Sequence, residues 1–316
     1  MEKRELGKTG IAVSPLMFGG NVFGWTVNEA ASFKLMDAFT DAGLNFIDTA
    51  DVYSRWVQGN TGGDSEMIIG KWFKQSGKRD KVILATKVGK DMGDGKKGLS
   101  AKYIKQAAEA SLKRLQTDYI DLYQSHEDDK DTPFEETLEA YGQLIKEGKV
   151  RAIGASNYKA NRLADALQTA ASHGLPSYQT LQPEYNLYAR QDYETNLQAL
   201  CVERGISVVP YYSLASGFLT GKYRSEADFG KSKRGQGIKI YLNDRGYRIL
   251  DGLDKVADQH QTSQASVALA WLMTRPGITA PIASATSIEQ LQALINATEL
   301  HLNEEALDLL TVASSY

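Results

Sequence analysis

Short β-rich runs alternate with amphipathic helical segments along almost the whole chain. Eight runs have the apolar character of buried strands, and they cover residues 15–18, 45–47, 82–86, 119–123, 150–154, 178–181, 207–210 and 278–282. The segments between them, such as "SAKYIKQAAEASLKRLQ", repeat apolar residues at steps of three and four, which is the helical period. This alternation predicts parallel strands joined by right-handed crossovers.

Eight such units predict a closed (β/α)8 TIM barrel, with eight strands inside a ring of helices. The stretch "RELGKTGIAVS" predicts an N-terminal β-hairpin that turns between Gly7 and Gly10. No linker rich in Pro, Gly or Ser divides the chain, so we expect residues 1–316 to form a single domain. The alternative is an open, doubly wound sheet, whose first strand ordinarily leads into G-x-G-x-x-G. The chain has "FGGNVFG" at that place, which favours the barrel.

Helix boundaries are marked most clearly in "TPFEETLEAYGQLIKEGK". Thr132 is expected to cap the helix N-terminus, with Pro133 at the first helical position and Glu135 completing a capping box. Gly148 stands just past the expected end.

Charge and composition argue against several classes of function. The 36 Lys and Arg residues oppose 39 Asp and Glu residues, so no basic excess attracts nucleic acid. The polar N-terminus and the lack of any run of about 18 apolar residues predict a cytoplasmic protein without a membrane partner. Cys201 is the only cysteine, and no His and carboxylate grouping has metal-ligand spacing. The sequence assigns no oligomeric state.

In such a barrel the active site forms where the strands end, at their C-terminal side. We therefore take the polar residues that follow each predicted strand as site candidates. From strands two to seven these are Asp48, Tyr53, Lys87, His126, Ser156, Asn157, Gln182 and Tyr211. All of them are expected to converge on one mouth of the barrel.

The first four candidates are expected to form a proton donor for a carbonyl group. A free tyrosine, with a pKa near ~10, is a poor acid, but an ammonium within about 4 Å stabilises phenolate by roughly 4 kcal/mol at an effective dielectric of 20. We expect Lys87 to supply that charge to Tyr53 and Asp48 to hold Lys87 protonated. His126 would hydrogen-bond the oxygen of a bound carbonyl. Such a phenol suits proton donation as hydride reaches the carbonyl carbon.

The chain resembles the aldo-keto reductases, specifically the bacterial branch that also resembles the potassium-channel β subunits. The resemblance covers nearly the whole length and rests on "NFIDTADVYS", "TKVG", "DYIDLYQSH", "TLEAYGQLIKEGKVRAIGASNY", "LQPEYNLY" and "YYSLASGFLTGKY". It places the family's catalytic tetrad on Asp48, Tyr53, Lys87 and His126. It implies an NAD(P)H-dependent reductase of aldehydes or ketones, reversible as an alcohol dehydrogenase, acting on a small carbonyl or sugar substrate.

The resemblance also implies NADP(H) or NAD(H), bound without a Rossmann domain. Gly20 and Asn21 would flank the nicotinamide beside Asp48, and Tyr211 would stack on its ring. The carboxamide group of the nicotinamide would accept and donate hydrogen bonds with Ser156, Asn157 and Gln182. The pyrophosphate would be wrapped by the segment 212–222, through backbone amides and one ammonium. The residues concerned are Tyr212, Ser213, Leu214, Ser216, Gly217 and Lys222.

The segment near the last strand departs from the family pattern. Many relatives carry a Lys or Arg there that binds the 2′-phosphate of NADP, whereas "PIASATSIEQLQAL" holds no cation. Ser284, Thr286 and Gln290 match the family's loop at this place and would contact the cofactor with uncharged side chains. A 2′-phosphate favours a compensating charge. Either Arg234 from "GKSKRGQG" reaches it, or the enzyme accepts NAD well.

Aromatic side chains in the long loops are the candidates for the substrate pocket: Trp25, Trp56, Tyr185 and Tyr188. Two other functions are weighed against the reductase. One is a cofactor-binding regulatory or partner subunit with little turnover, which the channel relatives suggest. The other is a Schiff-base aldolase with Lys87 as nucleophile, which Asp48 disfavours because it would keep the lysine charged.

Overall fold

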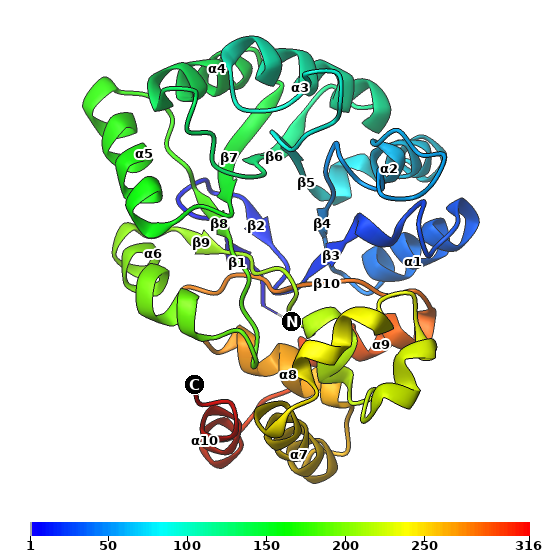
Figure 1. Cartoon of the computed structure of the whole chain (residues 1–316). Coiled ribbons are helices and arrows are strands. Elements are labelled where there is room, and N and C mark those ends of the chain that lie inside the picture. The colour runs from blue at the N-terminus through cyan, green and yellow to red at the C-terminus, as the bar shows by residue number, and fades with distance from the viewer. Residues whose placement is uncertain (1) are drawn as a thin grey trace.

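The computed structural model describes residues 2–316 and, within them, eight parallel strands that curl into a barrel surrounded by helices (Figure 1). The order around the sheet is β10-β3-β4-β5-β6-β7-β8-β9. The strands are β3 Met17–Gly19, β4 Phe46–Asp48, β5 Ile83–Val88, β6 Ile120–Ser125, β7 Val150–Ser156, β8 Thr180–Gln182, β9 Ser207–Val208 and β10 Ile282–Ala283. The predicted TIM barrel is confirmed.

The barrel closes through the chain just before β10. Val208 of β9 makes a parallel bridge with Ile278, and its backbone is bonded to Gly277 and Thr279 on either side. Further along, β10 pairs in parallel with β3. The last strand segment therefore contacts both edges of the sheet and completes the cylinder.

The helices lie outside the strands and cover them. Their bounds are α1 Glu29–Asp41, α2 Asp64–Ser76, α3 Ala101–Leu115, α4 Phe134–Lys146, α5 Ala160–His173, α6 Gln198–Arg204, α7 Asp244–Gln259, α8 Gln264–Met273, α9 Ile288–Ala297 and α10 Glu304–Ala313. Each of the first five follows a strand and returns the chain to the start of the next. This is the crossover pattern that the alternating sequence predicts.

The predicted capping of α4 is wrong in detail. The helix begins at Phe134, Pro133 holds the N-cap position, and no side chain caps it. The Thr132 hydroxyl instead donates to the Asp129 carboxylate at 2.8 Å. That carboxylate also accepts from backbone amides of the same turn, so the chain before α4 is organised around Asp129. Gly148 does follow the helix end, with a left-handed φ of 73°.

The predicted N-terminal hairpin is confirmed, and it covers one end of the barrel. Strands β1, Arg4–Glu5, and β2, Ala12–Val13, pair antiparallel, and Gly7 and Gly10 between them have positive φ. Apolar hairpin side chains pack against the strand residues inside the barrel, in the cluster Leu6, Ile11, Val13, Met17, Phe46 and Leu122. The hairpin therefore covers the end of the barrel opposite the C-terminal ends of the strands.

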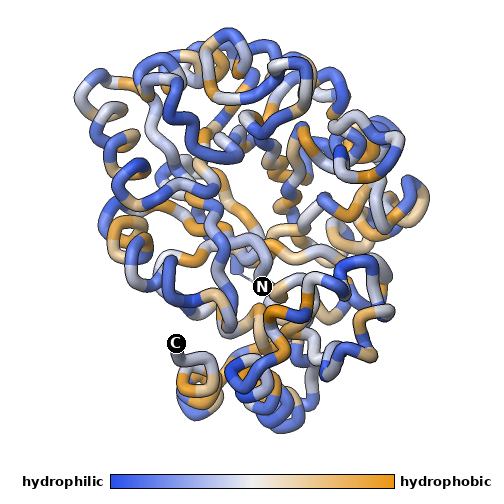
Figure 2. Tube along the Cα trace, in the orientation of Figure 1, coloured by the Kyte–Doolittle hydropathy of each residue, from blue (hydrophilic) through white to orange (hydrophobic). Residues whose placement is uncertain are grey.

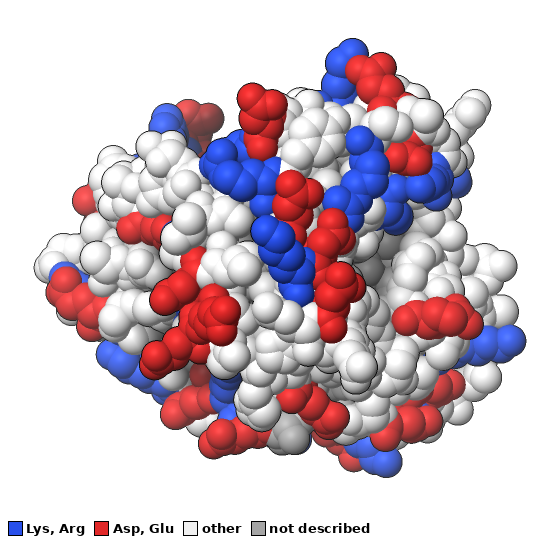
Figure 3. Space-filling view, turned by 90° about the horizontal axis from the view of Figure 1, so that it is seen from below, with Lys and Arg blue, Asp and Glu red and all other residues white. Residues whose placement is uncertain are grey.

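Apolar and charged residues are sorted as this architecture requires. Hydrophobic colour concentrates on the strands and on the helix faces that meet them, and hydrophilic colour lies outside (Figure 2). Acidic and basic side chains are interspersed on the face shown in Figure 3. Across residues 2–316, the structure contains no helix with the length and apolar character that a membrane span needs.

Strand ends explain how the barrel positions its polar side chains. Several strands run one or two residues beyond the predicted ends, so Asp48, Ser156 and Gln182 are final strand residues and Lys87 lies within β5. Parallel pairing places Asp48 beside Ala85, two residues before Lys87 on β5. Side chains of neighbouring strands are thereby fixed at one mouth.

Candidate active site

A buried ion pair lies at the centre of the barrel mouth. Lys87 Nζ on β5 is 2.7 Å from the carboxylate oxygens of Asp48 on β4. It also donates to the Thr49 carbonyl at 2.7 Å and to the Tyr53 hydroxyl at 3.2 Å. The three protons of the ammonium are therefore committed to three acceptors, and the tyrosine is one of them.

Burial governs the electrostatics of this pair. Loss of water raises the pKa of Asp48 and lowers the pKa of Lys87, while their mutual attraction acts against both shifts. Gln182 Nε2 on β8 gives Asp48 a further hydrogen bond at 3.2 Å. The charges of the carboxylate and the ammonium thus stabilise each other within a site that excludes solvent.

The pKa of Tyr53 differs from the expectation that Lys87 lowers it. Burial raises the pKa of Tyr53 well above 10, and the charge of Asp48 adds to this rise. The positive charge of Arg234 acts in the opposite direction. Because Lys87 is already paired with Asp48, its net effect on the phenol is small compared with desolvation. Tyr53 is therefore a fully protonated phenol at neutral pH, held by a hydrogen bond from Lys87.

His126, which follows β6, lies beside the tyrosine. Its ring centroid is 5.8 Å from that of Tyr53, with the planes nearly perpendicular. Burial and the charges of Lys87 and Lys90 lower the pKa of His126 well below 6.5, so the imidazole is neutral. Within residues 2–316, its Nδ1 has no hydrogen-bond partner. The structure brings all four members of the predicted tetrad together.

Asn157 links several of the other strand-end residues. Its amide nitrogen donates to the His126 carbonyl at 2.9 Å and to the Ser156 hydroxyl at 3.1 Å. Its amide oxygen accepts from the Tyr211 hydroxyl at 2.9 Å. Ser156 in turn donates to the carbonyl of Gln182 at 2.9 Å. Asn157 therefore positions the His126 backbone and the Tyr211 ring in this structure.

The loops after β3 and β10 meet beside the ion pair. Ser284 donates to the Gly19 carbonyl at 2.8 Å and to the Asn21 side chain at 2.7 Å. A side chain at Gly20 would come within 2.8 Å of the Asp48 carbonyl, so only glycine fits there. The Thr286 hydroxyl and the Gln290 side chain bond each other at 3.1 Å, further along the second loop.

The segment 212–222 runs from the mouth with a strained backbone. Tyr212, Ala215, Ser216 and Gly217 have positive φ, and the N–H groups of Ala215 and Gly217 bond the carbonyls of Tyr212 and Leu214 within the segment. Ser213 donates to the carbonyl of Pro210, which ties the segment to the end of β9. Lys222 Nζ lies 5.1 Å over the Tyr223 ring and forms no ion pair with the residues described. These features suit an anionic ligand.

Two of the four predicted pocket residues, Trp56 and Trp25, form a row of rings that begins at Tyr53. The Trp56 ring packs edge-on 5.7 Å from Tyr53, and Trp25 packs edge-on 5.7 Å from Trp56. Trp56 is half exposed, so the row of rings reaches the surface. The guanidinium of Arg234 lies 5.1 Å over the Trp25 ring.

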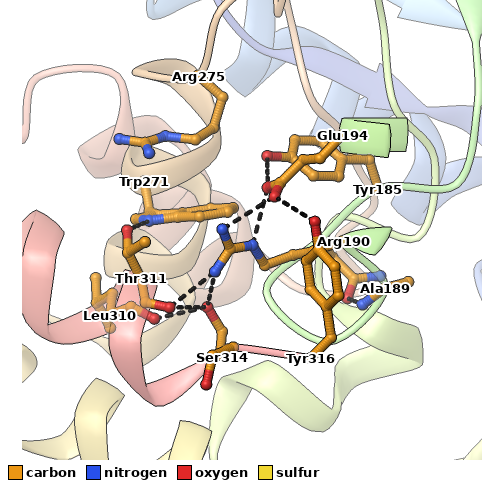
Figure 4. Close-up of polar contacts among 12 residues, drawn as sticks. Tyr185, Ala189, Arg190, Glu194, Trp271, Arg275, Leu310, Thr311, Ser314 and Tyr316 are labelled. Carbon is orange, nitrogen blue, oxygen red and sulfur yellow. Dashed lines mark hydrogen bonds and ion pairs between the residues drawn. The ribbon is translucent and has the colours of Figure 1, made fainter. Parts of the chain in front are cut away.

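Tyr185 and Tyr188 lie elsewhere. Tyr185 is fully buried and donates to Glu194, which binds Arg190 in a cluster at the C-terminal helix (Figure 4). The Tyr188 hydroxyl bonds the Ile240 carbonyl, and its ring packs against Tyr241. Both side chains brace the loop after β8 against other segments, and neither has a contact with the Trp25 and Trp56 rings.

A second buried polar layer behind Lys87 was missed from the sequence. Both carboxylate oxygens of Asp51 are buried without a hydrogen-bond partner within residues 2–316. Burial and the charge of Glu66 raise the pKa of Asp51 to about 8. Glu66 itself pairs with Arg114 at 2.6 Å. A second acid three positions after Asp48, in the same stretch, is the signal that could have identified Asp51.

Comparison with known proteins agrees with this geometry. The sequence model of the "Aldo/keto reductase family" matches residues 15–314. The chain belongs to the aldo/keto reductase family. As a member of it, the protein is an NAD(P)-dependent oxidoreductase, and the family's reaction is carbonyl reduction with NAD(P)H.

Relatives across nearly the full length include enzymes and channel subunits. Uncharacterized oxidoreductase YrpG of Bacillus subtilis is 38% identical over 98% of this chain and 95% of its own. Aldo-keto reductase YhdN of the same bacterium is 36% identical, over 96% and 91%. An Arabidopsis thaliana protein named as a probable voltage-gated potassium channel subunit beta is 33% identical, over 95% and 92%. The predicted bacterial aldo-keto reductase branch is confirmed.

The buried ion pair predicts non-additive effects on stability. Asp48→Asn or Lys87→Met alone leaves one buried charge without its partner, so each should lower the free energy of unfolding by about 3–5 kcal/mol. The double variant should recover much of this loss, because no unpaired charge remains. Urea denaturation measures all three.

The exposed pair Lys71 and Glu29, 2.6 Å apart, provides the control. Lys71→Met should cost less than about 1 kcal/mol. Strictly additive losses at Asp48 and Lys87 would contradict the description of them as a coupled pair.

Proposed function

We propose that this protein reduces aldehydes or ketones with NAD(P)H, reversibly, using Tyr53 as the general acid. The observation that carries the proposal is the placement of Lys87 Nζ between the Asp48 carboxylate, at 2.7 Å, and the Tyr53 hydroxyl, at 3.2 Å. This arrangement gives the phenol a fixed orientation at the mouth of the barrel and a cation beside the phenolate that forms.

Each residue of the tetrad has a distinct part in the proton transfer. When bound, a nicotinamide cofactor would supply the hydride that the carbonyl carbon accepts. Tyr53 carries its proton at Oη to the carbonyl oxygen, and Lys87 stabilises the remaining phenolate. Asp48 keeps Lys87 charged and aimed. The pKa of His126 is too low for protonation at neutral pH, so its ring is neutral. The one N–H of that ring would donate to the carbonyl oxygen and orient the substrate.

The strand-end and loop residues fit a dinucleotide. Tyr211, whose ring Asn157 fixes, would cover one face of the nicotinamide, and its carboxamide would meet Ser156 and Gln182. Gly20 and Asn21 would border the same ring. The left-handed backbone of segment 212–222, with Lys222, would receive the pyrophosphate through Tyr212, Ser213, Leu214, Ser216 and Gly217.

Two other functions receive less support. The channel-subunit name of one relative raises a partner-binding role, but a complete, hydrogen-bonded tetrad favours turnover. A Schiff-base aldolase would require a neutral Lys87 with a free lone pair. Lys87 instead commits its three protons to Asp48, Thr49 and Tyr53.

Removing the Tyr53 hydroxyl tests the reaction. Tyr53→Phe keeps the ring packing against Trp56 but removes the proton donor, so reduction of 4-nitrobenzaldehyde should fall by about 10³-fold or more. Cofactor binding, followed by quenching of protein fluorescence, should stay near wild type. Retained turnover in Tyr53→Phe would refute Tyr53 as the acid.

Cofactor choice is the second test. The loop after β10 offers Ser284, Thr286 and Gln290 to the adenosine end, and no Lys or Arg follows Arg275. We therefore expect the preference for NADPH over NADH, measured as a ratio of kcat/KM, to be less than about 100-fold. A larger ratio would show that a cation elsewhere in the chain binds the 2′-phosphate.

A further inference from the structure

Glu184 is a carboxylate at the barrel mouth, two residues past the end of β8. Its backbone makes a parallel bridge with Tyr211, and the Tyr211 N–H donates to the carbonyl of Pro183 at 2.9 Å. The pairing of β8 with β9 therefore continues past both strands and holds Glu184 and Tyr211 side by side. Because neighbouring strands lie about 5 Å apart, the two side chains start from adjacent points.

Alternation along the chain directs the Glu184 side chain into the mouth. In extended backbone, residues two apart point to the same face. Gln182 points inward, because its amide donates to Asp48 at 3.2 Å. Leu181 and Tyr185, on the opposite face, belong to the core between the strands and the helices. Glu184 therefore shares the inward face with Gln182.

Tyr211 has the same inward direction. Val209, two residues before it, belongs to the cluster that fills the barrel interior, and the Tyr211 ring packs against that cluster. Burial, and after it the charge of Glu184, raise the pKa of Tyr211 to about 12. The same two causes raise the pKa of Tyr241, from the segment after β9, to about 12. The carboxylate thus lies within electrostatic reach of both rings.

No cation balances the charge of Glu184. Across residues 2–316, its carboxylate takes part in no ion pair and in no hydrogen bond. The side chain reaches solvent, but neighbouring groups remove enough water to raise its pKa above 4.5. Asp48, by contrast, is paired with Lys87. Glu184 therefore places an uncompensated negative charge beside Tyr211.

The two neighbours of Glu184 indicate which ligand meets this charge. Gln182, on the same face, is proposed to bind the nicotinamide carboxamide, and Tyr211 is proposed to cover the ring. A ring bound there lies next to the carboxylate. Loss of a hydride turns a neutral dihydronicotinamide into a pyridinium cation, because the ring C–H bond breaks and both of its electrons leave with the hydrogen. The carbonyl carbon gains that hydride, and the carbonyl oxygen gains the proton of Tyr53.

We propose that Glu184 stabilises the positive charge of the oxidised nicotinamide, and so strengthens binding of NAD(P)⁺ relative to NAD(P)H and favours hydride transfer toward the carbonyl. A substrate cation is the competing partner. The proposed pocket rings Trp25 and Trp56, however, have their contacts with Tyr53, whereas Glu184 adjoins Tyr211. The placement of the nicotinamide ring in this assignment rests on the proposed reductase function.

The relative affinity for the two oxidation states of the cofactor tests the role of Glu184. Glu184→Gln keeps the size of the side chain and removes its charge. The dissociation constant of NADP⁺ divided by that of NADPH should rise about threefold to tenfold, since the charge acts across a partly solvated mouth. Glu184→Asp should keep most of the wild-type ratio because the charge remains. Quenching of protein fluorescence measures both constants.

Glu299 provides a control of equal charge. It is exposed beyond the end of α9, so Glu299→Gln should leave the ratio unchanged. An unchanged ratio in Glu184→Gln, or equal changes in the Glu184 and Glu299 variants, would overturn the proposal. Equal weakening of both oxidation states would also overturn it, because Glu184 would then act through contacts that do not depend on the ring charge.

The direction of hydride transfer gives a second readout. In single turnovers, Glu184→Gln should slow the reduction of 4-nitrobenzaldehyde by NADPH about threefold or more, because the ring gains its positive charge in that direction. Oxidation of 4-nitrobenzyl alcohol by NADP⁺ should not be slowed, because the ring loses its charge. A merely structural defect would slow both directions, and equal slowing would contradict the electrostatic role.

Binding also separates this assignment from the proposed reaction. Both dissociation constants are measured again in the Tyr53→Phe background, where no hydride transfer is expected. If the wild type reduces no aldehyde or ketone but Glu184→Gln still raises the ratio, the reductase function fails while the role of Glu184 at the oxidised ring stands. If reduction proceeds and the ratio does not change, the role of Glu184 fails alone.

Discussion

The pairing of Asp48 with Lys87 is the contact on which the arrangement of the proposed active site depends. Each charge would be costly alone in a site without water, and together they are held 2.7 Å apart by neighbouring strands. The β4 and β5 backbones fix this distance. Asp48 and the Thr49 carbonyl accept two of the ammonium protons, which leaves one proton for a third acceptor. Tyr53 occupies that place. The barrel therefore sets the orientation of the phenol through rigid strands.

The same burial that makes the pair necessary keeps the other two residues neutral. Desolvation raises the pKa of Tyr53 and lowers the pKa of His126, so the site contains a phenol that retains its proton and an imidazole that gains none. For carbonyl reduction, both neutral forms are the useful ones. In the proposed reaction, Lys87 would act chiefly on the phenolate that forms at Tyr53, since in the resting site its charge is balanced by Asp48.

Periodicity and strand ends allowed the barrel, and the clustering of Asp48, Tyr53, Lys87 and His126 at its mouth, to be predicted from sequence, because buried parallel strands and the polar residues that follow them are local patterns. Local patterns do not give the direction of a side chain in a loop. Tyr185 and Trp25 are both aromatic loop residues, yet Tyr185 turns into the cluster around Glu194 while Trp25 faces the row leading to Tyr53. The effect of Lys87 on Tyr53 was misjudged for a related reason, since desolvation depends on tertiary packing.

The pH dependence of kcat/KM for aldehyde reduction tests the central claim most directly. Tyr53 must carry its proton, and its raised pKa means that this form is lost only as the pH rises beyond about 10. The lowered pKa of His126 means that no protonation occurs near 6.5. The profile should therefore be nearly level from about pH 6 to 9 and fall only as the pH rises beyond about 10. A tenfold fall within about pH 6 to 9 that persists in Asp51→Asn, which removes the carboxyl with a pKa of about 8, would contradict a buried, neutral Tyr53 and His126 beside a compensated ion pair.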